Sequence, residues 1–399
     1  MKIAFITSRF PFPVEKGDKL RAYQHIRWLC TRHEVHLFAI THHQVREEDI
    51  RALKAICAGV HIYRINNSRL PFNLIAGLLK GLPASVAYFL DRKQKHMMQH
   101  EIIRLQPQHV FVQLIRAAEY VRVLPISKTL DYMDVFSVGA VQRARSGNLL
   151  LRPFFALEAS RLRKYEKSIY GAFTNHAIIS ARDRDRLPLP YQGSVSVLSN
   201  GVDLQYFSPM TNQSVKYEIV FVGNMGYVPN IEAVEFLVKK IMPLVWRSFP
   251  QSKVCLAGAR PHKRVLKLHS TQVEVTGWVD DIRAYYAQGL IFVAPMFSGM
   301  GQQNKILEAM AMECPCITTG LVDEAIGAAK EHALLIAEDQ DTFAQAICHL
   351  LANPEEIQRL GTKAREFVSG NYSWEMKNKA LDGLLTRHTT HRQSETIHV

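Results

Sequence analysis

Short apolar runs alternate with amphipathic stretches in the N-terminal part of the chain. Apolar side chains recur at helical spacing from Asp18 to Cys30 and again from Glu47 to Ala58, which predicts two helices. The apolar runs predict four strands, at Lys2 to Thr7, Glu34 to Ile40, Val60 to Ile65 and His109 to Leu114. Because strands and helices alternate, we expect a parallel sheet with helices on both faces.

A second round of the same pattern begins near residue 195. It predicts a helix from about Asn230 to Phe249. Its apolar runs predict strands at Val195 to Leu198, Glu218 to Val222, Lys253 to Ala257, Val273 to Thr276 and Leu290 to Ala294. Each of these runs ends at glycine, proline or asparagine, as a strand that leads into a ligand-binding loop does.

The two rounds predict an α/β protein with two doubly wound domains in tandem. We place the first domain at residues 1–190, the second at 191–372, and a C-terminal helix with a flexible tail at 373–399. Ligands of such sheets gather outside the carboxyl ends of the strands. The cleft between the two domains is therefore the expected site.

Composition narrows the class of protein. A chain of 399 residues with 47% hydrophobic side chains can bury substantial cores, which excludes a disordered or fibrous protein. The six cysteines show no zinc-type or redox-type spacing, and the first residues lack the apolar core of a signal peptide. Both features favour a cytoplasmic protein with free thiols.

The positive charge lies in the N-terminal half. Residues 1–200 hold 30 Lys and Arg against 15 Asp and Glu, whereas the rest hold 19 against 21. Such asymmetry indicates an anionic partner. No nucleic-acid motif is present, so we expect an anionic membrane surface at the inner face of the cell membrane, or a phosphate-bearing acceptor, and no nucleic acid.

One apolar stretch, Leu70 to Leu90, reaches the length of a membrane span. Lys80, Gly81 and Pro83 interrupt it, which argues against an ordinary transmembrane helix. Two alternatives stay open: a helical hairpin that packs on the domain, and an interfacial segment that dips into lipid headgroups.

The strongest local feature is the run Pro295 to Thr319, which predicts a strand end, a glycine loop, a helix and a strand. Gly299 and Gly301 allow backbone amides to approach a ligand, and a helix that starts near Asn304 directs its positive end at the same place, which suits a diphosphate. Lys305 is the best-placed cation for charge that develops on a leaving diphosphate, and Glu308 could accept hydrogen bonds from a ribose. A capping turn with a solvated glutamate and an exposed lysine is the alternative.

Other candidate chemistry is weaker. Asp280 and Asp281 precede a helical pattern and are typical of an N-cap pair, and none of the 17 histidines has ligand spacing, so no metal or other cofactor is predicted. The first strand lacks G-x-G-x-x-G, which argues against a nicotinamide oxidoreductase.

Five segments resemble a known family and follow one another in the family's order. They are S-N-G-V-D-L-Q-Y-F-S-P (199–209), F-V-G-N-M-G-Y-V-P-N (221–230), L-A-G-A-R-P (256–261), V-T-G-W-V-D-D-I-R-A-Y-Y (275–286) and L-E-A-M-A (307–311). With the glycine loop they resemble the retaining glycosyltransferases of family 4, whose GT-B fold consists of two facing Rossmann-like domains.

The N-terminal half carries a narrower likeness. R-F-P-F-P-V-E-K-G-D-K-L-R-A-Y (9–23) and L-D-Y-M-D-V-F-S (130–137) resemble the exopolysaccharide sugar transferases of bacterial exosortase systems. The resemblance implies retaining transfer of a sugar from a nucleotide-diphosphate donor, bound by the second domain, to a lipid-linked or growing saccharide acceptor, bound by the first. It places Asp131 and Asp134 with Lys305 as catalytic residues. The donor-binding residues would be Gly17, Asp18, Gly223, Asn224, Gly299, Gly301, Gln303, Asn304 and Glu308.

The chain departs from the family pattern at three positions. Glu308 matches the second glutamate of E-x(7)-E, but Met300 replaces the first, and Asn224 and Met225 occupy the places of the usual Arg and Lys. Two alternatives therefore stay open: a GT-B protein that binds a nucleotide sugar without catalysis, and a nucleotide-sugar epimerase on the same fold.

Overall fold

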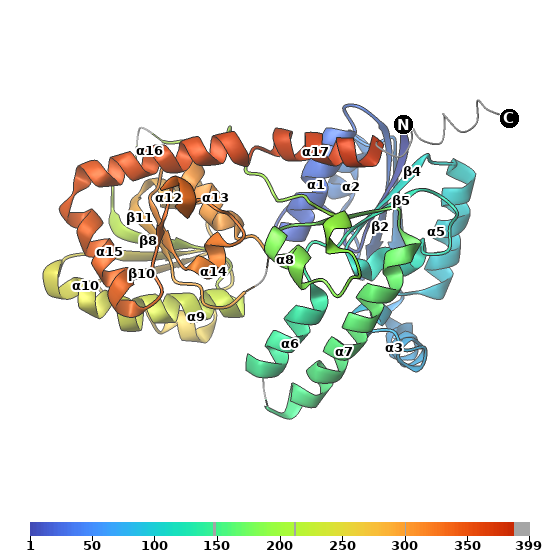
Figure 1. Ribbon diagram of the computed structural model, residues 1–399, viewed down its shortest axis with the longest axis horizontal. Coiled ribbons are helices and arrows are strands. Elements are labelled where there is room, and N and C mark those ends of the chain that lie inside the picture. Colours follow the sequence, from blue (N-terminus) through green and yellow to red (C-terminus); the bar gives the residue numbers. More distant parts are fainter. Residues whose placement is uncertain (147–148, 211–212, 300, 387–399) are drawn as a thin grey trace. The chain divides into compact units, whose positions relative to one another are not determined.

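The computed structural model describes residues 1–146, 149–210, 213–299 and 301–386, and it divides the chain into two compact units (Figure 1). Unit 1 comprises Met1–Ser199 and the chain from Lys377 onward, and unit 2 comprises Asn200–Met376. The first unit ends later than residue 190 because its last strand, β7 (Val195–Val197), pairs with β6 (Asn175–Ile178). Residues 387–399, where a flexible tail is expected, lie outside the described part.

Unit 1 is built on a seven-stranded parallel sheet with the order β3-β2-β1-β4-β5-β6-β7. The order reverses next to β1, so that the chain winds outward from β1 in both directions, as in doubly wound folds. The remaining strands are β1 (Lys2–Thr7), β2 (Glu34–Thr41), β3 (Gly59–Arg64), β4 (His109–Gln113) and β5 (Lys128–Asp131).

Helices cover both faces of this sheet. Ile3 and Phe5 of β1 enter one hydrophobic cluster and Ala4 and Ile6 enter the other, because successive strand side chains point to opposite faces. The helices of unit 1 are α1 (Gly17–Leu29), α2 (Glu47–Lys54), α3 (Leu70–Leu79), α4 (Ala84–Ala87), α5 (Arg92–Leu105), α6 (Phe136–Ser146), α7 (Arg152–Ile169) and α8 (Ala181–Arg186). Short 3-10 turns lie at Asn67–Arg69, Ile115–Tyr120, Leu149–Leu151, Tyr170–Ala172 and Gln192–Ser194.

The C-terminal helix α17 (Trp374–Thr386) completes unit 1. Its Leu381, Leu384 and Leu385 belong to the same cluster as Ile3 and Phe5. The Asn378 amide oxygen lies 2.6 Å from Nδ1 of His25 on α1, and Asn175 of β6 donates to the Leu384 carbonyl at 3.1 Å. One face of the first sheet is therefore covered by residues from the far end of the sequence.

Unit 2 repeats the design with a six-stranded parallel sheet in the order β10-β9-β8-β11-β12-β13. One hydrophobic cluster spans both faces of this sheet. Its strands are β8 (Tyr217–Val222), β9 (Val254–Ala257), β10 (Val273–Gly277), β11 (Gly289–Ala294), β12 (Cys316–Thr318) and β13 (Leu335–Ile336). The helices are α9 (Val228–Phe236), α10 (Met242–Ser248), α11 (Lys263–Leu266), α12 (Arg283–Ala287), α13 (Asn304–Ala311), α14 (Gly320–Asp323), α15 (Gln340–Ala352) and α16 (Pro354–Asn371), with a 3-10 turn at Ala329–Glu331.

The single helix expected from Asn230 to Phe249 begins earlier and contains a wide turn. A π-helical segment, Leu237–Ile241, separates α9 from α10, which has Pro243 in its first turn. Proline has no N–H to donate to the preceding turn and its ring clashes with the carbonyl four residues back, so the helix widens there.

The apolar stretch Leu70 to Leu90 folds into two helices. Gly77 of α3 lies against Ala87 of α4, where an added Cβ would come within 2.5 Å. Val86 of α4 is buried, whereas Phe72 and Leu79 of α3 are 73% and 84% exposed. The hairpin therefore packs through α4 and leaves one side of α3 in solvent. Among the described residues no helix is long and apolar enough to cross a membrane.

Loss of the α17 packing should destabilise unit 1. We predict that Leu381→Ala lowers the free energy of unfolding by about 2–5 kcal/mol, because it opens a cavity in a fully buried site. Leu79→Ala, at an exposed leucine, should change it by less than about 0.5 kcal/mol. Urea denaturation followed by circular dichroism measures both, and equal effects would contradict the packing of α17.

Candidate functional site

The carboxyl ends of β8 and β11 in unit 2 hold most of the residues predicted from the glycine loop. Gly299 and Gly301 have φ angles of +125° and +68°, which residues with a side chain rarely adopt, so this path of the chain favours glycine. The loop leads into α13, which begins at Asn304 as predicted. Met300, between the two glycines, lies outside the described residues.

Lys305, in the first turn of α13, points back toward the end of β8. Its Nζ donates to Oδ1 of the buried Asn230 on α9 and lies 3.3 Å from Sδ of Met296. The same ammonium sits 5.1 Å from the centre of the Phe221 ring of β8. It is therefore not the exposed lysine of the alternative interpretation, because α9, β8 and the loop after β11 all contact it.

The surroundings of Lys305 change its protonation. Burial lowers the pKa of its ammonium to about 7, and the negative charge of Glu308 opposes that shift. The ammonium therefore loses its proton at a much lower pH than an exposed lysine does. A group of this kind responds strongly to any anion placed beside it.

Glu308 lies one turn further along α13. Its Oε2 accepts a hydrogen bond of 2.9 Å from the hydroxyl of Tyr286 on α12, whose hydroxyl also lies 3.3 Å from the Lys305 carbonyl oxygen. Burial raises the pKa of Glu308, whereas the Tyr286 hydrogen bond and the Lys305 charge lower it. Tyr286 thus fixes the carboxylate orientation through one oxygen.

Three amide side chains hold the glycine loop against the start of unit 2. Oε1 of Gln302 accepts from the Asn200 N–H at 2.8 Å, and Asn200 Nδ2 donates to Oδ1 of Asn304 at 2.9 Å. Gln303 is the N-cap residue of α13 but makes no side-chain cap. Asn200 and Gln302 thus position the N-terminus of α13.

The loop after β8 is organised by its own backbone. The Gly223 N–H donates to the Ala257 carbonyl at 3.0 Å, and the Asn224 side chain accepts from the Gly226 N–H at 2.9 Å. The Asn224 carbonyl accepts from Asn230 Nδ2 at 2.9 Å, and Met225 is fully buried. Asn224 and Met225 therefore shape the loop, and the charge of the Arg and Lys they replace is missing there.

In unit 1, Gly17 and Asp18 open helix α1 beside the end of β1. Gly17 is exposed, and the Asp18 carboxylate forms an ion pair of 2.6 Å with Arg9 and does not cap the helix. Gln113, at the end of β4, donates to the Asp18 carbonyl at 2.8 Å. These contacts hold the α1 start at the carboxyl edge of the sheet.

Asp131, at the end of β5, is engaged by Arg21 of α1. The carboxylate oxygens lie 2.7 and 3.2 Å from Arg21 nitrogens, and both side chains are 0% exposed. Asp131 also accepts from the Met133 N–H at 3.2 Å. With no exposed surface, Asp131 can hold α1 against β5 but cannot touch a ligand in this conformation.

Asp134 occupies a different environment three residues further. Burial raises the pKa of its carboxyl to about 7, and Asp183 adds to the rise while Arg21 and Arg116 oppose it. Arg116 lies between the rings of Phe89 and Phe136, at 5.1 and 4.8 Å. A partly protonated carboxyl and a buried guanidinium therefore lie near each other at this edge of the unit 1 sheet.

Asp280 and Asp281, expected as an N-cap pair, do not cap α12, because Ile282 is its N-cap residue and no side chain caps it. Asp281 accepts from the Arg283 N–H at 3.0 Å and pairs with the Arg283 guanidinium at 2.7 Å, beside the start of α12. Within the described residues, no group of three or more His, Cys, Asp or Glu side chains could hold a metal ion.

Sequence reasoning missed several residues that organise the candidate site. Asn230 and Tyr286 lie at the ends of two of the quoted motifs, where their bonds to Lys305 and Glu308 depend on long-range packing. Asn200 is the second residue of the quoted segment 199–209. Arg21 lies in the quoted segment 9–23 and Arg116 in the 3-10 turn Ile115–Tyr120, and neither position gives a sign of its partner. Only the motif positions of Asn230, Tyr286, Asn200 and Arg21 could have drawn attention to these residues.

The family comparison agrees with the geometry of unit 2. Residues 216–353 match the model of the family "Glycosyl transferases group 1". The matched segment contains β8, α9, the glycine loop, Lys305 and Glu308.

Similar proteins cover the whole chain. An uncharacterized 44.6 kDa protein in the cps region of Klebsiella pneumoniae is 22% identical, over 93% of this chain and 96% of its own. Sucrose-phosphate synthase from Thermosynechococcus elongatus superimposes with a TM-score of 0.70 at 15% identity, over 100% of both chains. Anabaena Alr3699/HepE in complex with UDP and glucose gives 0.66 at 14% identity, over 97% of this chain and 99% of that one. These likenesses establish the GT-B fold with two Rossmann-like domains, as predicted.

The pKa of Lys305 predicts a pH effect on stability. Because the folded protein releases this proton near pH 7 and the unfolded chain near 10.5, the unfolded state binds more protons between these values. The unfolding free energy of the wild type should therefore rise with pH across this window relative to Lys305→Met. Urea titrations of both proteins at pH 7, 8 and 9 measure the difference. A gap that stays constant with pH would mean that Lys305 is not depressed.

Proposed function

We propose that the protein is a retaining glycosyltransferase that moves a sugar from a nucleotide-diphosphate donor to a lipid-linked or growing saccharide in cell-surface glycan synthesis. The observation that carries the proposal is the Lys305–Asn230–Glu308 arrangement at the carboxyl edge of the unit 2 sheet, inside the segment matched to group 1 glycosyl transferases. The cps region of the Klebsiella relative and the UDP and glucose bound by HepE support the glycan and the donor class.

The donor site is proposed from the groups that face this edge. The glycine loop and the amides at the start of α13 take the diphosphate, with Gly223, Asn224, Gln303 and Asn304 in the surrounding loops. Glu308 has one oxygen engaged by Tyr286, and its other oxygen is proposed to accept from a ribose hydroxyl. The Tyr286 hydrogen bond holds the carboxylate in place before the donor arrives.

Lys305 is proposed to stabilise the leaving diphosphate. Negative charge grows on the diphosphate as the glycosidic bond breaks, and a positioned ammonium meets that charge without reorganisation. Because a bound diphosphate raises the pKa of a neighbouring ammonium, Lys305 becomes fully protonated when the donor binds. The positive charge of Lys305 is especially important in this chain, because Asn224 and Met225 are uncharged.

The acceptor is proposed to bind unit 1. Asp134 is partly exposed after the end of β5. Gly17 and Asp18, at the start of α1, stay proposed as donor-binding residues, with Asp18 held by Arg9. Asp134 is proposed to contact an acceptor hydroxyl, and Asp131 to position α1 through Arg21. We expect the transfer to need no metal, so that EDTA leaves the rate unchanged.

Removal of the Glu308 carboxylate should weaken donor binding. We predict that Glu308→Ala costs about 1.5–3 kcal/mol of affinity for the preferred UDP-, GDP- or ADP-sugar, the scale of hydrogen bonds to a charged group. Isothermal calorimetry measures the affinity after a thermal-shift screen has selected the donor. Glu331→Ala, at an exposed glutamate, is the control and should bind normally. Unchanged affinity of a folded Glu308→Ala protein would remove Glu308 from the site.

Removal of the Lys305 ammonium should slow the chemical step. We predict that Lys305→Met lowers kcat by about a hundredfold or more and that Lys305→Arg recovers only part of it. Wild-type protein should also take up a proton on donor binding at pH 8, and Lys305→Met should not. Calorimetry in buffers of different ionisation enthalpy measures this uptake.

Two results would revise the role of Lys305. Near-normal turnover of Lys305→Met would move the role to another cation, with Arg9, Lys16 and Arg260 as the next candidates. Donor binding without turnover in the wild type, with every acceptor offered, would favour the non-catalytic alternative.

A peripheral association with anionic membranes is proposed through α3. Phe72, Ile75 and Leu79 expose apolar surface on one short helix, with Arg69 and Lys80 at its ends. Basic residues near an anionic leaflet contribute about 1 kcal/mol each, and a shallow apolar face adds to this.

Sedimentation with phosphatidylglycerol vesicles tests the association. We predict binding that falls steeply as salt rises, needs the anionic lipid, and weakens at least tenfold in Phe72→Ser/Leu79→Ser. The mostly exposed Val123 provides the matched control, because Val123→Ser removes apolar surface elsewhere in unit 1. A wild-type protein that ignores these vesicles at low salt would leave a soluble phosphate-bearing acceptor as the reason for the charge.

A further inference from the structure

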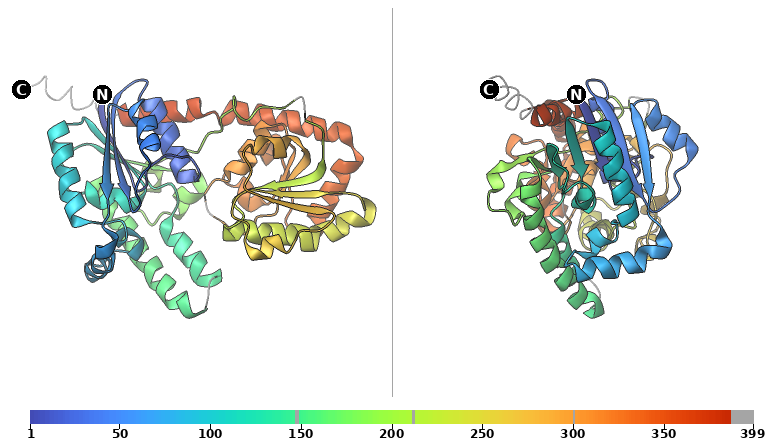
Figure 2. Two further views of the ribbon diagram at one scale, coloured as in Figure 1. Left: turned by 180° about the vertical axis from the view of Figure 1, so that it is seen from behind. Right: turned by 90° about the vertical axis from the view of Figure 1, so that its right-hand side faces the viewer.

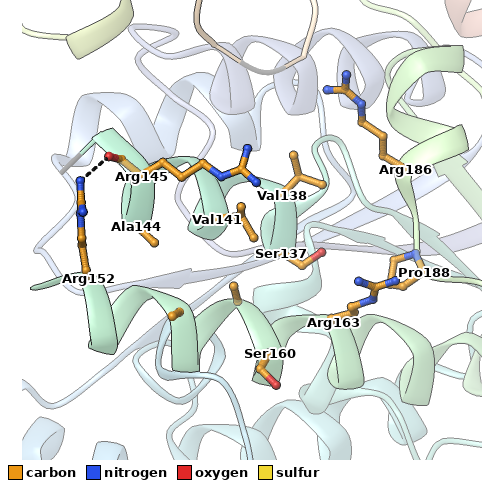
Figure 3. A pocket seen from close by; sticks show the side chains of 12 residues that line it. Ser137, Val138, Val141, Ala144, Arg145, Arg152, Ser160, Arg163, Arg186 and Pro188 are labelled. Atoms are coloured by element: carbon orange, nitrogen blue, oxygen red, sulfur yellow. Dashed lines mark hydrogen bonds between the residues drawn. The ribbon is translucent and has the colours of Figure 1, made fainter.

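The helical hairpin α6–α7 in unit 1 encloses a pocket that the proposed donor and acceptor residues do not use. Its volume is about 670 Å³, within the roughly 300–1,000 Å³ range of small-molecule sites. Figure 3 shows the pocket between the two helices, with side chains from both directed into it. The apolar part of the lining comes from Val138, Val141, Ala144, Ala156, Ala159 and Pro188.

Four arginines surround this apolar lining. Arg145 belongs to α6, Arg152 and Arg163 to α7, and Arg186 to the end of α8. All four are exposed, and in the described part of the chain none of them forms an ion pair. Arg152 donates to the Arg145 carbonyl at 3.2 Å, and this hydrogen bond connects the start of α7 to the end of α6. Among the residues that the structure describes, no carboxylate lines this pocket.

The acidic side chains of the hairpin face inward. Glu158 accepts from the N–H groups of Ala84 and Ser85 at 2.7 and 2.9 Å, and Glu166 accepts from the Ser137 N–H at 3.1 Å. Both glutamates are buried. The charged side chains that α6 and α7 expose to solvent are therefore basic. A second hollow of about 540 Å³ lies beside the pocket and is lined by Lys164 and Lys167, together with Asp185 of α8, which pairs with Arg184.

The tip of the hairpin is apolar and exposed. Leu150 is 86% exposed, and Phe154 and Leu157 of α7 expose about half of their surface. Figures 1 and 2 show this tip and helix α3 projecting from the same end of unit 1. Glu158 of α7 connects the α6–α7 hairpin to the α3–α4 segment, because its carboxylate accepts hydrogen bonds from the first N–H groups of α4.

We propose that the α6–α7 pocket binds the lipid phosphate of the acceptor, with the first part of the alkyl chain on the apolar lining and the phosphate among the arginines. Guanidinium groups bind phosphate oxygens in pairs of hydrogen bonds, and the absence of a carboxylate in the lining removes competition for them. The exposed apolar tip gives the chain a continuous path to a bilayer. A free nucleotide or sugar phosphate would leave the apolar lining in water.

This inference rests on the proposed function in one respect: the proposed function is what makes the bound lipid phosphate part of the acceptor. The pocket belongs to unit 1, whereas Lys305 and Glu308, whose variants test the donor site, belong to unit 2. The two parts can therefore be tested separately, with donor affinity as the readout for unit 2 and alkyl phosphate affinity as the readout for the pocket.

The test uses hexadecyl phosphate below its micelle concentration as the probe, with the full-length protein. Hexadecanol supplies the chain without the phosphate, and inorganic phosphate supplies the phosphate without the chain. The pocket variant is Arg145→Ala/Arg163→Ala/Arg186→Ala. The control, Arg51→Ala/Lys54→Ala/Arg92→Ala, removes the same number of exposed charges elsewhere in unit 1. A further variant, Val141→Asp, places a carboxylate in the lining.

We expect the wild type and the charge control to bind hexadecyl phosphate at least tenfold more tightly than hexadecanol or phosphate. The pocket variant and Val141→Asp should lose that binding at least tenfold while keeping their donor affinity. Equal affinity for hexadecyl phosphate and hexadecanol, or equal loss in the charge control, would overturn the proposal. Normal probe binding with no donor binding would instead contradict the proposed function and leave the pocket assignment intact.

Discussion

The contact between the Lys305 ammonium and Asn230 is the interaction on which the candidate donor site depends. It joins α13 to the loop that follows β8, and the same lysine packs against Phe221 and Met296. Asn230 in turn fixes Asn224 through its amide nitrogen. One partly buried cation therefore sets the position of both loops at this edge of the sheet, and its cost of burial appears as the lowered pKa.

Unit 1 also has a buried cation, Arg21, near the carboxyl edge of its sheet, but this cation is paired with a carboxylate. Arg21 is fully buried but meets Asp131 in a two-point ion pair, and an arginine does not give up its proton in proteins. The Arg21 pair is therefore a fixed structural connection from α1 to β5. Lys305 faces an amide as its nearest oxygen partner, so its charge can follow the charge of a ligand.

Much of the fold was accessible from the sequence because apolar runs and amphipathic stretches report local structure directly. The strands around Phe5, Phe221 and Phe292 and the start of α13 at Asn304 were predicted closely. The packing of α17 on the first sheet was not predicted. Its leucines indicate that the helix is buried, but they do not indicate which of the two cores they enter. Lys305 and Glu308, which lie in one motif, could be named as candidates from the sequence, and their roles stay predictions. Their partners Asn230 and Tyr286 come from other elements, and Asp131 proved to be buried by an arginine over a hundred positions away.

The division of the chain has a consequence for its synthesis on the ribosome. Leu381 and its neighbours on α17 complete the core around Ile3 and Phe5, but they are translated after all of unit 2. At about 5–20 residues per second, the intervening segment takes on the order of 10–40 s to make. During that time this face of the first sheet is packed by α1 and α2 but lacks the leucines of α17. The nascent chain is therefore a natural client for a chaperone at that face, and unit 2 can finish folding before unit 1.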